Sequence, residues 1–143
     1  MRTLSLAAGA VVMALSVTHA LAGASDDARR HFDAIAAGQV DDIMAAYGDK
    51  ARFEWIGGPL NGTYAGTDEI RGVWSKFAKA NAPLKVSVAK LEESANPQGS
   101  TVTANVEFSG KNTIKVRYAL TYRDGRLVNE IWQIDPKLSS AAY

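Results

Sequence analysis

Three side chains in this sequence have the chemistry for acid–base work: a glutamate, a histidine and a tyrosine. Glu130 lies in a predicted strand at 126–135, Tyr118 on the apolar face of a predicted strand at 113–123, and His31 in the first predicted helix. Apolar surroundings disfavour the charged form of a carboxylate, while an imidazole and a phenol can polarise a carbonyl or hydroxyl group. Together they predict proton abstraction beside a carbonyl, or acid–base hydration chemistry, on a small apolar molecule.

The side of the sheet that Glu130 faces depends on the turn at Asp124-Gly125. A two-residue turn would place Asn129 inside. A three-residue loop with a bulge would instead align Tyr118 with Glu130 across the hairpin. We favour the three-residue loop, because Trp132 and its apolar neighbours then join the apolar face. In this interpretation the side chain of Glu130 faces the interior of the fold.

Each of these side chains also has a plainer interpretation. Glu130 could pair with a cation at Arg117, Arg52 or Lys115, or lie at a solvated rim. The histidine could be a partly exposed helix residue. The tyrosine and the tryptophans could be ordinary core, because aromatic side chains bury a large area.

The elements that position these residues follow from hydrophobic periodicity. Helical spacing predicts helices at 25–37, 40–47 and 67–80. Alternation predicts a strand at 51–56, an optional short strand before the third helix, and four long strands at 84–93, 101–109, 113–123 and 126–135. Because helices cluster early and long strands late, the sequence predicts an α+β fold whose antiparallel sheet curls around the helices.

The amino terminus has the pattern of a secretory signal peptide. An apolar stretch follows Arg2, and small residues then fit two cleavage sites, after Ala22 or after Ala24. Thr18-His19 interrupts the apolar stretch too early for a membrane anchor. We therefore predict a cleaved segment 1–22, a single domain at 23–143 and a periplasmic or secreted protein. Cleavage would leave His31 as the sole histidine.

Composition excludes several classes of protein. The 143 residues include no cysteine, which rules out disulfides, thiolate nucleophiles and cysteine metal sites. The one histidine that cleavage would leave rules out histidine-rich zinc sites. The formal net charge is +1 and no basic run occurs, so we predict no nucleic-acid partner. Phosphate loops, nucleophile elbows and dinucleotide fingerprints are absent from the sequence, and we predict neither cofactor nor metal.

The order of elements and four local patterns resemble the nuclear transport factor 2-like superfamily, in its SnoaL-like and ketosteroid-isomerase-like branch. The patterns are Ala37-Gly38-Gln39-Val40-Asp41, Tyr47-Gly48-Asp49-Lys50-Ala51, Gly62-Thr63-Tyr64-Ala65-Gly66 before Ile70, and Asp124-Gly125-Arg126-Leu127-Val128. The resemblance spans nearly all of 26–135. It implies a cone formed by a curved sheet around three helices, an apolar pocket at the wide end, and frequent homodimers.

The resemblance also bears on the site. Steroid isomerases use a carboxylate base, a tyrosine and a protonated aspartic acid. By local comparison His31 stands at the tyrosine position, the base falls near Trp55, and the protonated acid near Tyr118. Because both carboxyl groups are missing, the resemblance argues against that particular reaction. Strand alternation and the resemblance together predict a ligand-binding wall of Trp55, Trp132, Phe32, Phe53, Phe108 and Leu120.

Two functions follow from this interpretation. In the first, the cone binds a small apolar or amphipathic molecule, with isomerase- or cyclase-like activity from Glu130, His31 and Tyr118 in an enzymatic version. That version predicts that Glu130→Gln abolishes turnover and leaves the fold intact. In the second, aromatic side chains fill the cavity and the protein is a non-catalytic homodimeric or scaffold module. The outer sheet face would then be its interface, with Thr103, Asn105, Glu107, Lys115, Arg117 and Gln133.

Overall fold

The structure is a computed structural model, and it describes residues 23–139. The predicted signal peptide, 1–22, lies outside the described residues, and its cleavage stays a prediction. Among the helices that are described, none combines the length and the apolar character needed to cross a membrane.

The described chain contains helices and strands in an early-helix, late-strand order. The helices are α1 (Ala24–Ala37), α2 (Val40–Met44) and α3 (Thr67–Asn81). The strands are β1 (Tyr47–Ile56), β2 (Gly62–Ala65), β3 (Lys85–Asn96), β4 (Gly99–Ser109), β5 (Thr113–Arg123) and β6 (Arg126–Ile134). The optional strand is therefore present as β2, and the second helix ends three residues before the predicted Tyr47.

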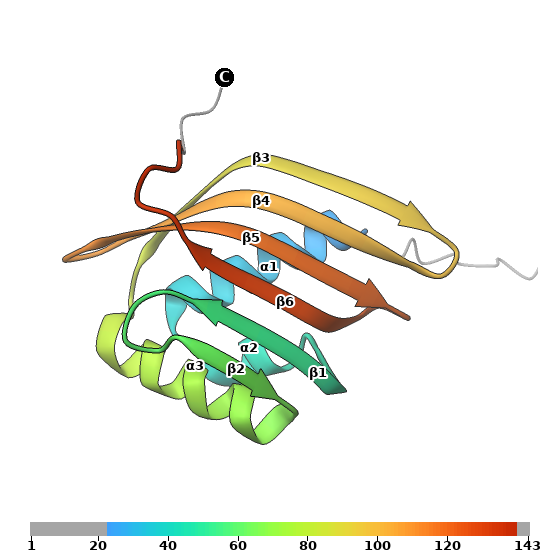
Figure 1. The fold of residues 1–143 in the computed structure, drawn as a ribbon, viewed down its shortest axis with the longest axis horizontal. Coiled ribbons are helices and arrows are strands. Elements are labelled where there is room, and N and C mark those ends of the chain that lie inside the picture. Colours follow the sequence, from blue (N-terminus) through green and yellow to red (C-terminus); the bar gives the residue numbers. More distant parts are fainter. Residues whose placement is uncertain (1–22, 140–143) are drawn as a thin grey trace, which may run out of the picture.

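The strands form one curved sheet in the order β2-β1-β6-β5-β4-β3. Figure 1 shows β3 to β6 curving over α1, while α3 lies against β1 and β2. This confirms the predicted α+β cone around three helices. One pairing differs from the antiparallel prediction: β1 runs parallel to β6, so the sheet is mixed. Helix α3 separates the early strands β1 and β2 from the late strands β3 to β6 in sequence, and β1 joins the edge of the meander formed by β6.

Helix α1 illustrates why the sequence folds this way. Ala28, Phe32 and Ile35 follow the helical period and are fully buried against the sheet. The helix ends at Gly38, whose φ of 71° is in the left-handed region that glycine adopts readily. A Cβ at Gly38 would lie 2.4 Å from the Cβ of Ala82, so the approach of the chain after α3 also requires glycine.

The β5–β6 hairpin corrects the predicted register. Asp124 and Gly125 both have positive φ, 50° and 71°, as in the two-residue type I′ turn, and the three-residue loop is wrong. A bulge at Val128 then adds one residue to β6, because Tyr122 pairs with Leu127 while Thr121 pairs with Asn129. The bulge restores the orientation that the rejected loop was meant to provide. Glu130 faces the interior and is 0% exposed.

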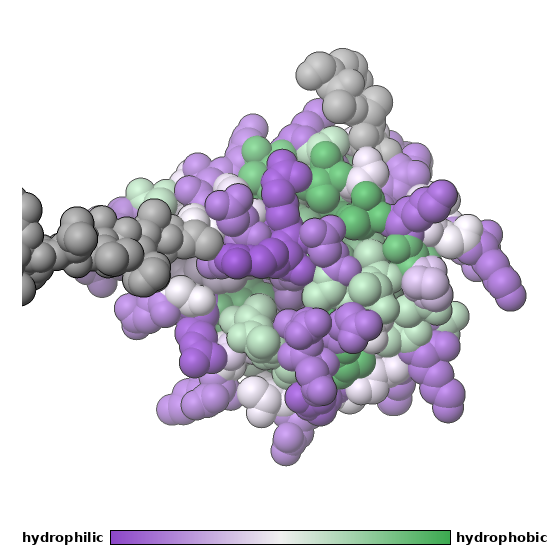
Figure 2. Space-filling model, turned by 180° about the vertical axis from the view of Figure 1, so that it is seen from behind, coloured by the Kyte–Doolittle hydropathy of each residue, from purple (hydrophilic) through white to green (hydrophobic). Residues whose placement is uncertain are grey.

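The face of the molecule seen from behind carries hydrophilic side chains around several apolar areas (Figure 2). Asn105, on the outer face of the sheet, is buried. Its amide donates to the carbonyl oxygen of Ser139, and its Oδ1 accepts from Arg117. The chain after β6 therefore covers part of the face that the scaffold hypothesis assigns to a partner.

Candidate functional site

A buried carboxylate forms the polar centre of the cone. Three side chains meet Glu130: His31 Nε2 lies 2.7 Å from Oε2, Tyr118 Oη donates to Oε2 at 2.6 Å, and Tyr47 Oη donates to Oε1. Because a carboxylate only accepts hydrogen bonds, His31 donates through Nε2. We call these four residues the Glu130 cluster.

Four different elements position the Glu130 cluster. Glu130 comes from β6 after the bulge, His31 from α1, Tyr118 from β5 and Tyr47 from the first residue of β1. A fifth side chain, Trp74 of α3, donates from Nε1 to Tyr47 Oη at 2.8 Å. The cluster thus links all the layers of the fold through one carboxyl group.

The two tyrosines of the cluster hold their protons strongly. Burial raises the pKa of Tyr47 and of Tyr118 well above the ordinary value, and the nearby charge of Glu130 raises both further. Both phenols therefore stay protonated and can donate to the carboxylate across the neutral range. The alternative pairing of Glu130 with Arg117, Arg52 or Lys115 is not found among the described residues, where the basic side chain at Glu130 is His31. Arg117 contacts Asn105, and Arg52 contacts Glu54.

Aromatic rings fill the cone on the other side of Tyr118. The ring of Trp132 stacks on Trp55 at 4.5 Å between centroids and on Phe108 at 5.3 Å, and it meets Tyr118 edge-on at 5.6 Å. Phe77 of α3 packs edge-on against Trp132 at 5.4 Å. These contacts close the interior between the cluster and the end of the cone at which β6 ends.

A hollow of about 670 Å³ lies at one end of the cone, outside these rings. It is bordered by the loop after β1, the second half of α3, the start of β5 and the end of β6. We call it the mouth hollow. Its lining residues are Trp55, Pro59, Leu60, Lys76, Phe77, Ala80, Asn81, Asn112, Thr113, Ile114, Lys115, Trp132, Ile134 and Pro136.

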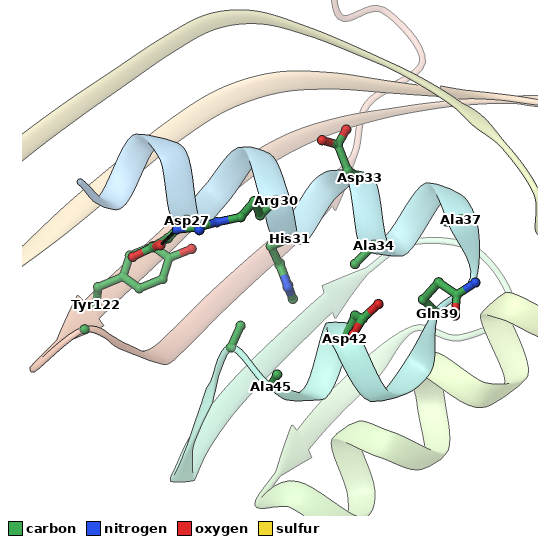
Figure 3. Close-up of a pocket in the computed structure, with 12 residues that line it drawn as sticks. Asp27, Arg30, His31, Asp33, Ala34, Ala37, Gln39, Asp42, Ala45 and Tyr122 are labelled. Carbon is green, nitrogen blue, oxygen red and sulfur yellow. Dashed lines mark hydrogen bonds and ion pairs between the residues drawn. The ribbon is translucent and has the colours of Figure 1, made fainter. Parts of the chain in front are cut away.

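A second hollow, of about 630 Å³, lies at the opposite ends of β5 and β6, between α1, α2 and the β5–β6 turn. Figure 3 shows His31 pointing from α1 toward α2, and Tyr122 pointing from β5 toward α1. We call it the helix-side hollow. Its lining residues are Asp27, Arg30, His31, Asp33, Ala34, Ala37, Gln39, Asp42, Ala45, Ala46, Tyr122 and Gly125.

The structure brings the predicted acid–base residues together. Glu130, His31 and Tyr118 are in contact, but Glu130 and Tyr118 are 0% exposed and line neither hollow. Their catalytic role stays a prediction. Of the predicted ligand-binding wall, Trp55 and Trp132 line the mouth hollow, whereas the other members are packed interior that borders neither hollow: Phe32, Phe53, Phe108 and Leu120.

Two members of the polar centre were missed from the sequence. Tyr47 ends the predicted second helix but is the first residue of β1. The strand alternation of 51–56 does not reach it, because Asp49 is exposed and the register with β6 shifts between Tyr47 and Arg52. Trp74 lies on the apolar side of the third predicted helix, and nothing in its spacing reveals that its indole N–H has a buried partner.

With this geometry in place, comparison with known proteins becomes informative. The model of the SnoaL-like domain matches residues 28–130. The chain belongs to this family. A search of curated proteins finds no match. The SnoaL-like domain lies within the superfamily predicted from the sequence, which confirms that resemblance.

Solved structures agree on the fold. A protein with a cystatin-like fold from Nostoc punctiforme has a TM-score of 0.66 at 14% identity, covering 81% of this chain and 91% of its own. A nuclear transport factor 2-like protein from Burkholderia xenovorans has a TM-score of 0.61 at 16% identity, with coverages of 80% and 84%. A SnoaL-like protein from Burkholderia thailandensis has a TM-score of 0.59 at 16% identity, with coverages of 78% and 94%. At these identities the three neighbours establish the shared fold alone.

Proposed function

We propose that this SnoaL-like protein binds a small amphipathic molecule with an anionic end in the mouth hollow. The observation that carries the proposal is the composition of the lining, which joins buried aromatic rings to two lysines and contains no aspartate or glutamate. A volume of about 670 Å³ lies within the range of ligand sites in proteins. An apolar body would rest on the ring edges and displace water from them.

The polar groups of the mouth hollow specify the charged end of the ligand. Trp132 is fully buried, and its Nε1 has no hydrogen-bond partner. An indole N–H can only donate, so its hydrogen-bond partner on a ligand would be an acceptor such as an oxygen. Lys76 on α3 and Lys115 on β5 stand on different walls and favour an anion between them. A carboxylate on a short apolar chain satisfies all three groups.

Acid–base catalysis at Glu130, His31 and Tyr118 is a second candidate. It is favoured by a carboxylate that shares one buried centre with an imidazole and two phenols. A substrate in the mouth hollow would reach Glu130 only after Trp132 and its stacked neighbours move, because these rings occupy the intervening space. Binding without chemistry needs no such rearrangement, and the geometry supports it better.

Decanoate and decanol provide a direct test, because they share an apolar chain and differ in charge. The three tryptophans of the chain all lie in the ring stack or at the mouth, so their fluorescence reports on a ligand there. We expect saturable binding of one decanoate per chain, tighter than decanol. Titration calorimetry gives the stoichiometry.

The matched variants are Ala80→Phe and Ser75→Phe. Both positions are exposed on α3, but only Ala80 lines the mouth hollow, so Ala80→Phe should block decanoate and Ser75→Phe should not. Absence of saturable binding, or equal loss in both variants, would refute the proposal.

Export belongs to the proposal as a separate step. The tripartite pattern of residues 1–22 supports cleavage by a signal peptidase. The mass of the protein recovered from expressing cells tests it, since cleavage after Ala22 would give a chain beginning at Gly23. An intact Met1 in the recovered protein would contradict export by this route.

A further inference from the structure

The buried polar atoms that the fold leaves unpartnered gather at the two hollows. Among the described residues they are His31 Nδ1, Tyr122 Oη and Trp132 Nε1. Trp132 lines the mouth hollow, whereas His31 and Tyr122 both line the helix-side hollow and are only 2% and 4% exposed. Buried polar groups in proteins almost always have a partner, so two such atoms at one hollow indicate a ligand.

Both of these atoms can accept a hydrogen bond. His31 Nε2 faces Glu130, and in a neutral imidazole that donates through Nε2 the other nitrogen carries a lone pair. Burial raises the pKa of Tyr122, and the charges of Glu130 and Asp27 raise it further, so its phenol stays neutral. A neutral phenol oxygen also accepts hydrogen bonds. Both atoms can therefore receive a hydrogen bond from a donor on a ligand.

The charge of the lining agrees with a cationic donor. Asp27, Asp33 and Asp42 line the helix-side hollow against one cation, Arg30, which is paired with Asp27. The lining thus has the opposite sign from that of the mouth hollow. Its remaining wall consists largely of alanine methyl groups, which offer a small apolar surface between the polar positions.

We propose that the helix-side hollow is a second binding site, for a small aliphatic ammonium compound. The ammonium N–H groups donate to Tyr122 Oη and His31 Nδ1, and the carboxylate of Asp42 supplies the compensating charge. The alkyl chain lies against the alanines of α1 and α2. This site does not depend on the mouth hollow, because the two are formed by opposite ends of β5 and β6.

The test uses n-butylammonium and n-butanol, which have nearly the same shape and differ in charge. Amide chemical shifts of the full chain are followed by NMR during titration with each compound. We expect saturable shifts of the α1 and α2 amides with n-butylammonium and none with n-butanol. Hydrogen bonds to charged groups predict that Asp42→Asn and Tyr122→Phe each weaken this binding about tenfold.

Two features keep the test interpretable. Tyr122→Phe retains the ring and removes only a hydroxyl without a partner, so its melting temperature should match that of the unmodified protein. Glu92→Gln removes an exposed carboxylate that lines neither large hollow and should leave the affinity unchanged. Absence of saturable shifts, equal binding of n-butanol, or full affinity in both site variants would overturn the proposal.

Discussion

The Glu130 cluster and the mouth hollow contain similar residue types but differ in whether their buried polar groups have hydrogen-bond partners. In the cluster every oxygen of the buried carboxylate has a donor, and the donors come from three other elements of the fold. In the mouth hollow the buried indole of Trp132 has no partner, and the lysines of the rim face an apolar floor. A polar centre satisfied within the protein stabilises the fold, whereas one left unsatisfied beside a hollow is available to a ligand.

The largest loss of stability should come from disrupting the hydrogen bonds of the Glu130 cluster. In Glu130→Gln the carboxamide nitrogen faces either a tyrosine hydroxyl or the imidazole N–H. A hydrogen-bond acceptor is then replaced by a donor at a position where the protein already supplies donors. Loss of a charged partner in a buried network predicts destabilisation of about 3 kcal/mol. Urea unfolding followed by circular dichroism measures this free energy. The structure thus revises the expectation that this variant leaves the fold intact, and an unchanged midpoint would show that the cluster is not a stabilising centre.

Alkaline pH should lower the stability of the folded protein through the two tyrosines of the Glu130 cluster. The folded-state pKa values of Tyr47 and Tyr118 are raised, so above pH of about 10 the unfolded chain releases protons that the folded chain retains. Stability is therefore full below that pH and falls above it, by about 1.4 kcal/mol per pH unit for each such tyrosine. Urea midpoints between pH 8 and 11 test this. Tyr118→Phe should lower the slope by one tyrosine, and an unchanged slope would contradict the assignment.

The sequence contained enough information for the interior position of Glu130 but not for its partners. Strand parity and a required bulge placed the carboxylate inside, although the bulge lies at Val128 in β6 and not in the turn. Both arrangements give the same facing, so the conclusion survived a wrong register. Asp-Gly at positive φ was the local signal for the two-residue turn, and we overrode it to bring Trp132 inside.

The hollows could not be predicted from the sequence, because they depend on how side chains from distant elements fill space. Alternation correctly placed Phe108 and Leu120 on the inner face, but inner-face residues can pack against one another or border a cavity. The stacking of Trp132 between Trp55 and Phe108 decides between these outcomes, and it is a property of the assembled cone. Strand alternation identifies which residues face the inside of a sheet, but it does not determine how those residues pack.

Reversing a charge in the lining of the mouth hollow should weaken the binding of an anionic ligand there. Lys76→Glu replaces a cation of the mouth hollow by an anion, and the exposed rim pair predicts that decanoate binding weakens about fivefold. Lys79→Glu makes the same change on an exposed position of α3 outside the lining and should have little effect. Calorimetry with both variants measures the difference. Equal affinities in the two variants would show that the rim charge does not select the ligand.

The smallest expected effect is the dependence of this selectivity on salt. Rim lysines are partly open to solvent, and the screening length falls from about 30 Å at 0.01 M to a few ångströms near 1 M salt. Added salt should therefore weaken decanoate binding relative to decanol by about twofold to threefold, while stability of the closed Glu130 cluster changes little. Using the ratio of the two ligands cancels the general strengthening of apolar association by salt. A ratio that is independent of salt would place the carboxylate of the ligand away from Lys76 and Lys115 and leave the indole of Trp132 as its partner.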